Sequence, residues 1–100
     1  MSDASPVGLL VHNEGDGVAV AVRDLEPGEV PVAWLDSGRR AVVRVGEAVP
    51  LGHKVALVDL AEGHPVIEYG TQVATTRRAV AAGSHVHTHN VRSARWQRSA

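Results

Sequence analysis

The chain contains no cysteine and no phenylalanine, and its only aromatic residues are two tryptophans and one tyrosine. The absence of cysteine excludes disulfide bonds and thiolate chemistry. With so few aromatic rings, the core of this 100-residue chain has to be built from aliphatic side chains, chiefly its 18 valines and 14 alanines. Valine is restricted at χ1 and favours extended backbone. The composition therefore predicts a single domain that is rich in β-strands.

The sequence also lacks a charge bias, a long apolar run and the common nucleotide-binding motifs. A formal net charge of −1 argues against a general nucleic-acid-binding protein, which would be strongly basic. No apolar run approaches the roughly 20 residues of a membrane span, and the first residues lack the features of a signal peptide. No phosphate-binding loop, dinucleotide fingerprint or nucleophile elbow is present. We therefore expect a cytoplasmic protein that binds neither nucleic acid nor membrane.

Short apolar segments alternate with turns that contain glycine or proline along most of the chain. This order predicts an all-β fold, either a compact barrel or a sandwich. The predicted strands are residues 9–11, 18–22, 30–35, 40–45, 53–58, 66–70 and 85–91. Pro31 indicates an edge strand or a bulge, and residues 75–82 are the one segment in which we expect a helical turn. A domain at residues 8–92 is expected between a flexible leader (1–7) and a basic tail (93–100), which is either a solvated terminus or a docking arm.

One four-residue outline recurs three times in the chain: an apolar residue, two others and a glycine. It occurs at residues 25–28, 60–63 and 80–83, and a valine follows each glycine within three residues. The unequal spacing excludes a solenoid repeat. We interpret the outline as one turn type used repeatedly, with glycine supplying a positive φ before a strand. Chance recurrence in a chain rich in valine and glycine is the alternative.

The densest candidate for chemistry is a segment with three histidines at alternate positions. On a strand, His85, His87 and His89 would project from the same face. Neutral imidazoles bind divalent metal ions and act as general acids or bases near pH 7. We therefore expect a functional site here and take all three histidines as candidate metal ligands. The alternative is a solvated histidine-rich strand without an ion, since three histidines without a carboxylate would need ligands from elsewhere.

A second candidate lies at residues 52–54. Lys54 can offer a positive charge to a carboxylate, and His53 can form hydrogen bonds with hydroxyl groups. His12 is next to a glycine-rich loop and can approach the same site. A polar strand start and a loop residue are the alternative interpretations. Glu68 and Tyr69 are weaker candidates for substrate contacts, because packing and solubility account for both.

Together these segments resemble the SAF-type domain of the altronate/galactarate dehydratase family over about residues 9–91. The specific part of the resemblance is the combination of Gly-His-Lys at residues 52–54 with Val-His-Thr-His-Asn at residues 86–90. The other matching segments are residues 10–12, 18–25, 28, 55–57, 59–60, 63, 66–70 and 83. Residues 75–80 depart from the family, which tends to have small and acidic residues there, and this leaves the substrate open.

The resemblance implies a β-clip fold, which is a compact arrangement of bent strands. It also implies a hydro-lyase that acts on sugar acids such as altronate or galactarate, often with a divalent metal such as Fe²⁺, Mn²⁺ or Mg²⁺. The family places this domain at the start of a longer chain or encodes it as a small subunit. Because this chain stops just after the motif, we expect it to be a small subunit that works with a large catalytic subunit.

The resemblance also assigns roles to residues of the chain. His87 and His89 would be catalytic, and the base that abstracts a proton can belong to the large subunit. The substrate-binding residues would be His12, His53, Lys54 and Asn90. We expect the isolated chain to be inactive, because a β domain of this size has few places in which to enclose a charged acid away from water. The alternatives are a small subunit of a sulfolactate sulfo-lyase and a non-catalytic module that binds a sugar acid or a partner.

Overall fold

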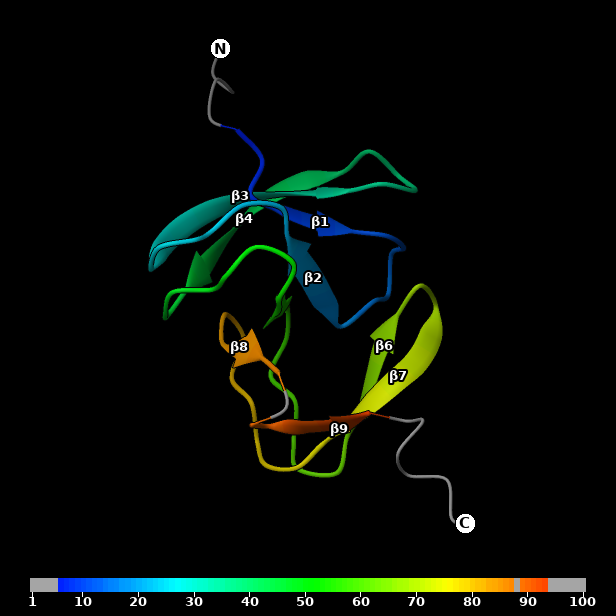
Figure 1. The fold of residues 1–100 in the computed structure, drawn as a ribbon. Helices are drawn as coiled ribbons and strands as arrows, with labels where there is room; N and C mark the ends of the chain where they lie inside the picture. The colour runs from blue at the N-terminus through cyan, green and yellow to red at the C-terminus, as the bar shows by residue number, and fades with distance from the viewer. Residues whose placement is uncertain (1–5, 88, 94–100) are drawn as a thin grey trace.

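The computed structural model describes residues 6–87 and 89–93, and within these ranges the chain forms strands and no helix (Figure 1). The strands are β1 (Leu9–Val11), β2 (Val18–Ala21), β3 (Gly28–Trp34), β4 (Arg40–Val45), β5 (Lys54–Ala56), β6 (Pro65–Glu68), β7 (Thr71–Thr76), β8 (His85–Val86) and β9 (Val91–Ser93). The prediction of an all-β fold is confirmed. No helix able to cross a membrane occurs in this part of the chain.

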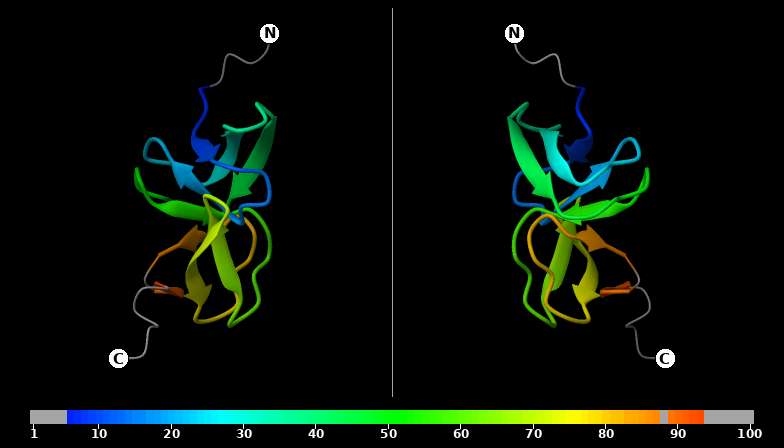
Figure 2. Two further views of the ribbon diagram at one scale, coloured as in Figure 1. Left: turned by 90° about the vertical axis from the view of Figure 1, so that its right-hand side faces the viewer. Right: turned by 90° about the vertical axis from the view of Figure 1, so that its left-hand side faces the viewer.

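The strands form two curled sheets at opposite ends of the molecule, an arrangement visible in both side views of Figure 2. The larger sheet has the order β4-β3-β1-β2-β5-β8, and the smaller has the order β6-β7-β9. Among the ladders of the described residues, only that of β1 and β3 is parallel, and the others are antiparallel. Short, bent strands in a small domain without helices agree with the β-clip fold that the resemblance implies.

Each sheet has its own apolar core. The core of the larger sheet contains Trp34 and aliphatic residues of β1 to β5. The core of the smaller sheet also receives side chains from the larger one, namely Val18, Ala56 and Val86. These three come from β2, β5 and β8, so this end of the larger sheet is packed against the smaller sheet. The junction between the two sheets is therefore formed by apolar side chains of both.

Two pairs of turns in the chain have the same pattern of backbone hydrogen bonds. Leu25 and Val49 exchange two backbone hydrogen bonds of 2.8 and 3.0 Å, and Leu60 and Val80 exchange two of 2.8 Å. The glycines that end the recurring outline, at positions 28, 63 and 83, have φ values of 137°, 77° and 88°. The predicted positive φ is therefore confirmed at all three glycines. The shared turn is present at residues 60–63 and 80–83, where the N–H after the glycine donates to the carbonyl of Ala61 or Ala81, whereas Gly28 already belongs to β3.

An aspartate completes each pair of turns in the same way. The carboxylate of Asp24 accepts a hydrogen bond of 2.9 Å from the backbone N–H of Leu51, and that of Asp59 accepts one of 2.9 Å from Ala82. One pair lies in each core. The fold therefore has two related halves, and the junction between them carries β5 and β8.

Several predicted elements are wrong in detail. Residues 75–82 do not form a helical turn, since Thr75 and Thr76 belong to β7 and the remainder is a loop. Residues 85–91 are not one strand, since β8 ends at Val86 and β9 begins at Val91. Pro31 lies in an interior strand and not at an edge. The ladder between β3 and β1 begins only at the next residue, Val32, so the missing N–H of Pro31 removes no hydrogen bond from that ladder. Most of the predicted leader and tail, at residues 1–5 and 94–100, lies outside the described residues.

Candidate functional site

The candidate site lies where β5 and β8 pair at the end of the larger sheet. The two strands are antiparallel, and Lys54 pairs with Val86. In this register His53, just before β5, comes opposite His87, just after β8. Side chains that face each other across such a ladder are in contact. The two rings accordingly stack, with centroids 4.3 Å apart and an angle of 11° between their planes.

His85 and His89 join these two rings. The Nε2 atom of His85 is 2.8 Å from the Nδ1 atom of His53, a hydrogen bond whose direction depends on the tautomers. The ring centroid of His85 is 5.6 Å from that of His87 and 5.3 Å from that of His89. We call these four residues the His cluster. The three histidines at alternate positions thus come together with a fourth, His53, which directly precedes β5 and which local spacing did not place beside them.

A turn, and not a strand face, gathers the histidines that follow β8. The side-chain oxygen of Asn90 accepts a hydrogen bond of 3.0 Å from the backbone N–H of His87, and its side-chain nitrogen donates one of 2.8 Å to the carbonyl of His85. The backbone N–H of Asn90 donates to the carbonyl of His87. Asn90 is buried. The side chain of Asn90 therefore stabilises the turn in which His87 and His89 lie.

The surroundings of His85 and His87, two members of the His cluster, favour the neutral imidazole. Desolvation by burial is the main cause that lowers the pKa of His85 below its usual value, and His53 and His89 lower it further. Glu47, whose carboxylate accepts a hydrogen bond of 3.0 Å from the backbone N–H of His85, acts in the opposite direction. The pKa of His87 is also lowered, first by desolvation and then by His53 and His89. A neutral ring can accept a proton or bind a metal ion.

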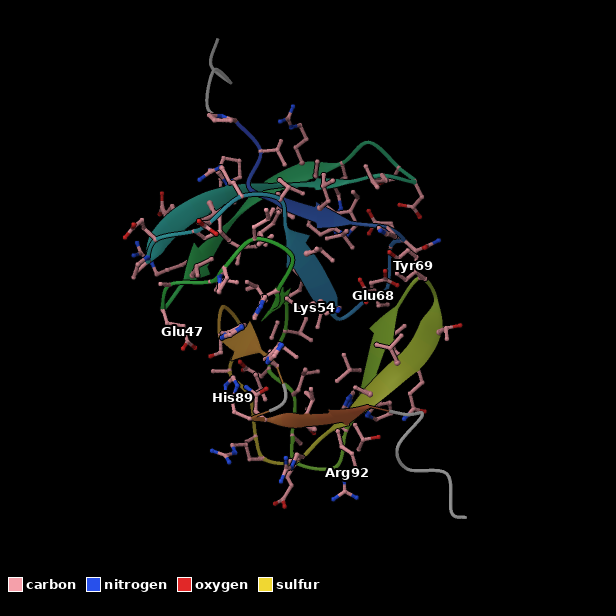
Figure 3. All side chains as sticks on the ribbon, viewed as in Figure 1. Glu47, Lys54, Glu68, Tyr69, His89 and Arg92 are labelled. Carbon is pink, nitrogen blue, oxygen red and sulfur yellow. The ribbon has the colours of Figure 1, made fainter. Side chains whose placement is uncertain are left out.

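Lys54 lies beside the His cluster and connects it to the smaller sheet. Its Nζ atom is 3.6 Å from the Oε1 atom of Glu68, whose side chain is only 7% exposed. The side chain of Lys54 is 35% exposed, so its ammonium group is accessible to a ligand at the surface. Figure 3 shows Lys54 near the middle of the molecule, with His89 toward one side and Glu68 and Tyr69 toward the other.

His12, the remaining candidate, lies outside the His cluster. Its ring packs against that of Tyr69, with centroids 3.9 Å apart. Tyr69 follows Glu68, the partner of Lys54. His12 therefore belongs to a separate group of side chains, which adjoins Lys54 through Glu68. The turn that presents Tyr69 is held by Asp16, a residue that was not among the sequence candidates.

The His cluster does not form a metal site by itself. In the part of the chain that the structure describes, no three histidine, cysteine, aspartate or glutamate side chains are arranged to hold an ion. The Nδ1 atom of His53 and the Nε2 atom of His85 are hydrogen-bonded to each other. The rings of His53 and His87 are stacked, so their nitrogens do not converge on one point. The expected ligand set of His85, His87 and His89 does not fit an ion in this arrangement, and we assign no chemical step to a metal.

A small cavity opens beside the His cluster, between the two sheets. Its volume is about 220 Å³, and Lys54 and His87 are its polar lining residues. The apolar lining consists of Val66, Val73, Ala74, Val86 and Val91. A larger cavity of about 430 Å³, near Arg77 and Arg92, contains no histidine. Lys54 and His87 thus line a small cavity, while His53, His85 and His89 are not among its lining residues.

Comparison with known proteins gives a family match over most of the chain. The model of the altronate/galactarate dehydratase SAF domain matches residues 7–94. The chain is 37% identical over 92 residues to (2R)-sulfolactate sulfo-lyase subunit alpha of Chromohalobacter salexigens, which covers 90% of this chain and 98% of that protein. It is 43% identical over 79 residues to altronate dehydratase of Escherichia coli, which covers 78% of this chain but only 15% of that protein.

A second sulfo-lyase subunit alpha, from Paracoccus pantotrophus, is 44% identical over 48 residues, or 48% of this chain and 72% of that protein. The chain thus spans nearly all of one relative and about a seventh of the length of the Escherichia coli dehydratase.

Proposed function

Because the chain belongs to the family of altronate/galactarate dehydratase SAF domains, we propose that it is the small subunit of a two-chain lyase, and that its His cluster lines an active site shared with a large catalytic subunit. The names of the relatives support a lyase, and the term subunit alpha supports a separate partner chain. Where the relative is a dehydratase, the matching part is a small share of a longer chain that carries further domains or segments.

The observation that carries the proposal is the meeting of four imidazoles and one ammonium group at one end of β5 and β8. His87 and His89 are the exposed rings of this set, whereas His53 and His85 are partly covered. Polar side chains grouped at the mouth of a small cavity can line one wall of a site. A charged acid also needs to be shielded from water for its chemistry. A second chain that covers the His cluster would provide the remaining walls.

The chemistry that suits this set is an elimination from a hydroxy acid. A base removes the proton from the carbon next to the carboxylate, and the electron pair of that C–H bond forms a C=C bond. The bond from the adjacent carbon to the leaving group breaks, and the leaving group departs with its electron pair. The resulting enol becomes a 2-keto acid. Neutral and protonated imidazoles can serve as base and acid in these steps, and Lys54 can hold the carboxylate.

We assign His87 and His89 to proton transfer and His53 and Lys54 to substrate binding. The base that removes the first proton can come from the large subunit, in which case His87 and His89 assist the leaving group. The side chain of Asn90 is occupied by the backbone of the turn. Its contribution to substrate binding is therefore indirect, through the position of His87.

Two leaving groups fit the same proton abstraction. The match with almost the whole of a sulfo-lyase subunit supports sulfite as the leaving group and sulfolactate as the substrate. The higher identity to an altronate dehydratase supports hydroxide and a sugar acid of the altronate or galactarate type as the second candidate. From the sequence alone, a sugar acid was the first candidate for the substrate. Because the chain matches nearly the full length of a sulfo-lyase subunit, we now propose sulfolactate as the first candidate and the sugar acid as the second.

The experiment is to use the tagged chain as bait in its native host, identify the co-purified chain, and assay the complex with sulfolactate, altronate and galactarate. Formation of sulfite or of a 2-keto acid is measured. The proposal expects a large partner and turnover of at least one acid by the complex and of none by the isolated chain. Turnover by the isolated chain, or a complex that is inactive with all three acids, would contradict it. A stable free chain that binds a sugar acid without a partner would instead support a non-catalytic binding module.

A further inference from the structure

The hairpin between β6 and β7 has an unusual residue in its turn. Glu68 pairs with Thr71, so Tyr69 and Gly70 form a two-residue turn, and their φ values are 58° and 71°. Two positive φ values are the mark of a type I′ turn, in which asparagine or aspartate followed by glycine is preferred. Within residues 6–87 and 89–93, Tyr69 is the only non-glycine residue with a positive φ. The geometry of the turn therefore does not explain why a tyrosine is present.

A buried carboxylate from a distant loop holds this turn in place. The Oδ2 atom of Asp16 accepts a hydrogen bond of 2.9 Å from the backbone N–H of Tyr69, and the Oδ1 atom accepts one of 3.0 Å from Gly70. Oδ2 also accepts a bond of 3.3 Å from the backbone N–H of Asn13. Asp16 is only 6% exposed. One side chain thus joins the loop after β1 to the β6–β7 turn and fixes the strained residue.

The result of this arrangement is a pair of rings, one of which has no hydrogen-bond partner. The ring of Tyr69 covers that of His12, with centroids 3.9 Å apart, while Tyr69 is itself 61% exposed. Both ring nitrogens of His12 are buried, and neither has a partner in the described part of the chain. Buried polar atoms in folded proteins nearly always have a partner, so an exception requires an explanation. A ligand that enters between the rings would provide the missing partner.

The ring pair adjoins the charged residues of the candidate site. Glu68, which precedes Tyr69, is buried and forms an ion pair of 3.6 Å with Lys54. Lys54 also adjoins the His cluster, since it lines the same cavity as His87 and directly follows His53 in the chain. A ligand whose carboxylate binds Lys54 can therefore extend either to the His cluster or to the ring pair.

We propose that His12 and Tyr69 form a second subsite of the shared active site, which binds a hydroxyl group of the substrate acid, and that Asp16 is its positioning residue. A neutral imidazole has one donor and one acceptor, and a phenol hydroxyl is both, so a hydroxyl group is the ligand group that they match. Lys54 would then hold the carboxylate between this subsite and the His cluster. This inference rests on the proposed function, because it requires a hydroxy-acid substrate.

The test compares variants of the chain in complex with its large partner. Tyr69→Asn replaces the tyrosine by a residue that suits the turn, so the isolated chain is expected to keep or raise its melting temperature. His12→Leu removes the unpaired nitrogens and should also leave the chain at least as stable. In the complex, both variants are expected to raise KM about tenfold or more, because a hydrogen bond to the substrate is lost, with little change in kcat. His12→Gln, which keeps a donor and an acceptor, is the conservative control and should retain more of the affinity. Tyr69→Phe keeps the ring but lacks the hydroxyl, so it should raise KM as Tyr69→Asn does.

The outcomes separate this inference from the proposed function. Turnover by the wild-type complex supports the proposed function, and an unchanged KM in both Tyr69→Asn and His12→Leu would then overturn the subsite alone. If the wild-type complex binds one of the three acids by calorimetry but does not turn it over, the proposed function fails. The dissociation constants of the same variants then replace KM in judging the subsite. A wild-type complex that binds none of the three acids would overturn both.

Discussion

The Nδ1 atom of His53 and the Nε2 atom of His85 lie 2.8 Å apart, so at least one of these two rings must be neutral. A hydrogen bond between two ring nitrogens needs an N–H on one and a lone pair on the other. Protonation of both rings would break it. This contact ties the two histidine-containing segments into one unit, because one ring precedes β5 and the other opens β8.

The first prediction concerns the effect of pH on stability. The pKa values of His85 and His87 are lowered in the folded chain, while an unfolded histidine titrates near pH 6.5. Above that pH both states are neutral, and the two residues contribute nothing. As the pH falls below about 6.5, the unfolded chain binds protons that the folded chain does not, so the free energy of unfolding decreases. Urea denaturation at several pH values measures this decrease.

The double variant His85→Gln/His87→Gln is the control for the pH prediction. It lacks the two depressed pKa values and should lose less stability between about pH 7.5 and 5.5 than the wild type. A wild-type chain whose free energy of unfolding changes no more than that of the double variant would contradict the assignment.

The second prediction concerns Gly83, which lies two residues before His85. It has a φ of 88°, and a Cβ atom added there would collide with the backbone carbonyl of Arg44. Gly83→Ala should therefore lower the free energy of unfolding by about 3 kcal/mol or more, because strain and overpacking add. Gly63→Ala is the matched control, since it has a φ of 77° and no atom within 4 Å of the added Cβ. It should cost only about 1–2 kcal/mol. Equal losses in the two variants would show that the contact with Arg44 does not matter.

The third prediction distinguishes a structural role of Asn90 from direct binding of substrate. Asn90→Ala leaves the N–H of His87 and the carbonyl of His85 without their side-chain partner. We expect the isolated chain to lose about 1–3 kcal/mol of stability, measured by chemical denaturation. Asn90→Asp keeps the acceptor for His87 and should lose less than Asn90→Ala. An Asn90→Ala chain of unchanged stability whose complex has a raised KM would show instead that Asn90 contacts the substrate.

The fourth prediction separates the two roles of Lys54. Lys54→Met removes the partner of the buried Glu68 and should cost about 1–2 kcal/mol, a value between those of exposed and buried ion pairs. Adding Glu68→Gln removes the unpaired charge and should restore most of the stability. Turnover should not return in the double variant, because the substrate carboxylate still lacks its cation. Recovery of both stability and activity in the double variant would show that Lys54 acts only through Glu68.

Much of the fold could be predicted from local patterns, but elements that depend on distant contacts could not. Alternating valine and alanine, as in β2, and glycine-ended turns marked most of the strands correctly. The strand β7 was missed because its residues, Thr-Gln-Val-Ala-Thr-Thr, show no regular apolar alternation. It is a strand because it lies between β6 and β9 in the smaller sheet. Residues 85–91 do alternate, yet the hydrogen bonds of Asn90 turn the chain between β8 and β9.

The candidate site was predicted in part for the same reason. The spacing of His85, His87 and His89 indicated that these residues come together, although a turn rather than a strand face brings this about. The position of His53 depends on the register of β5 and β8, which no local pattern reveals. The role of Asp16 could not be predicted from its neighbours in the sequence, which indicate only a turn. Its partners Tyr69 and Gly70 are more than 50 residues away.

The central claim is that the His cluster takes part in a reaction that needs a second chain. Its most direct test is the turnover of sulfolactate and altronate by the purified complex of the large partner with either the wild-type chain or the His87→Ala/His89→Ala variant. His64→Ala serves as the control. We predict that the double variant still binds the partner but loses at least about 100-fold in turnover, while His64→Ala retains wild-type activity. A double variant that assembles with the partner and turns over the acid at the wild-type rate would contradict the account.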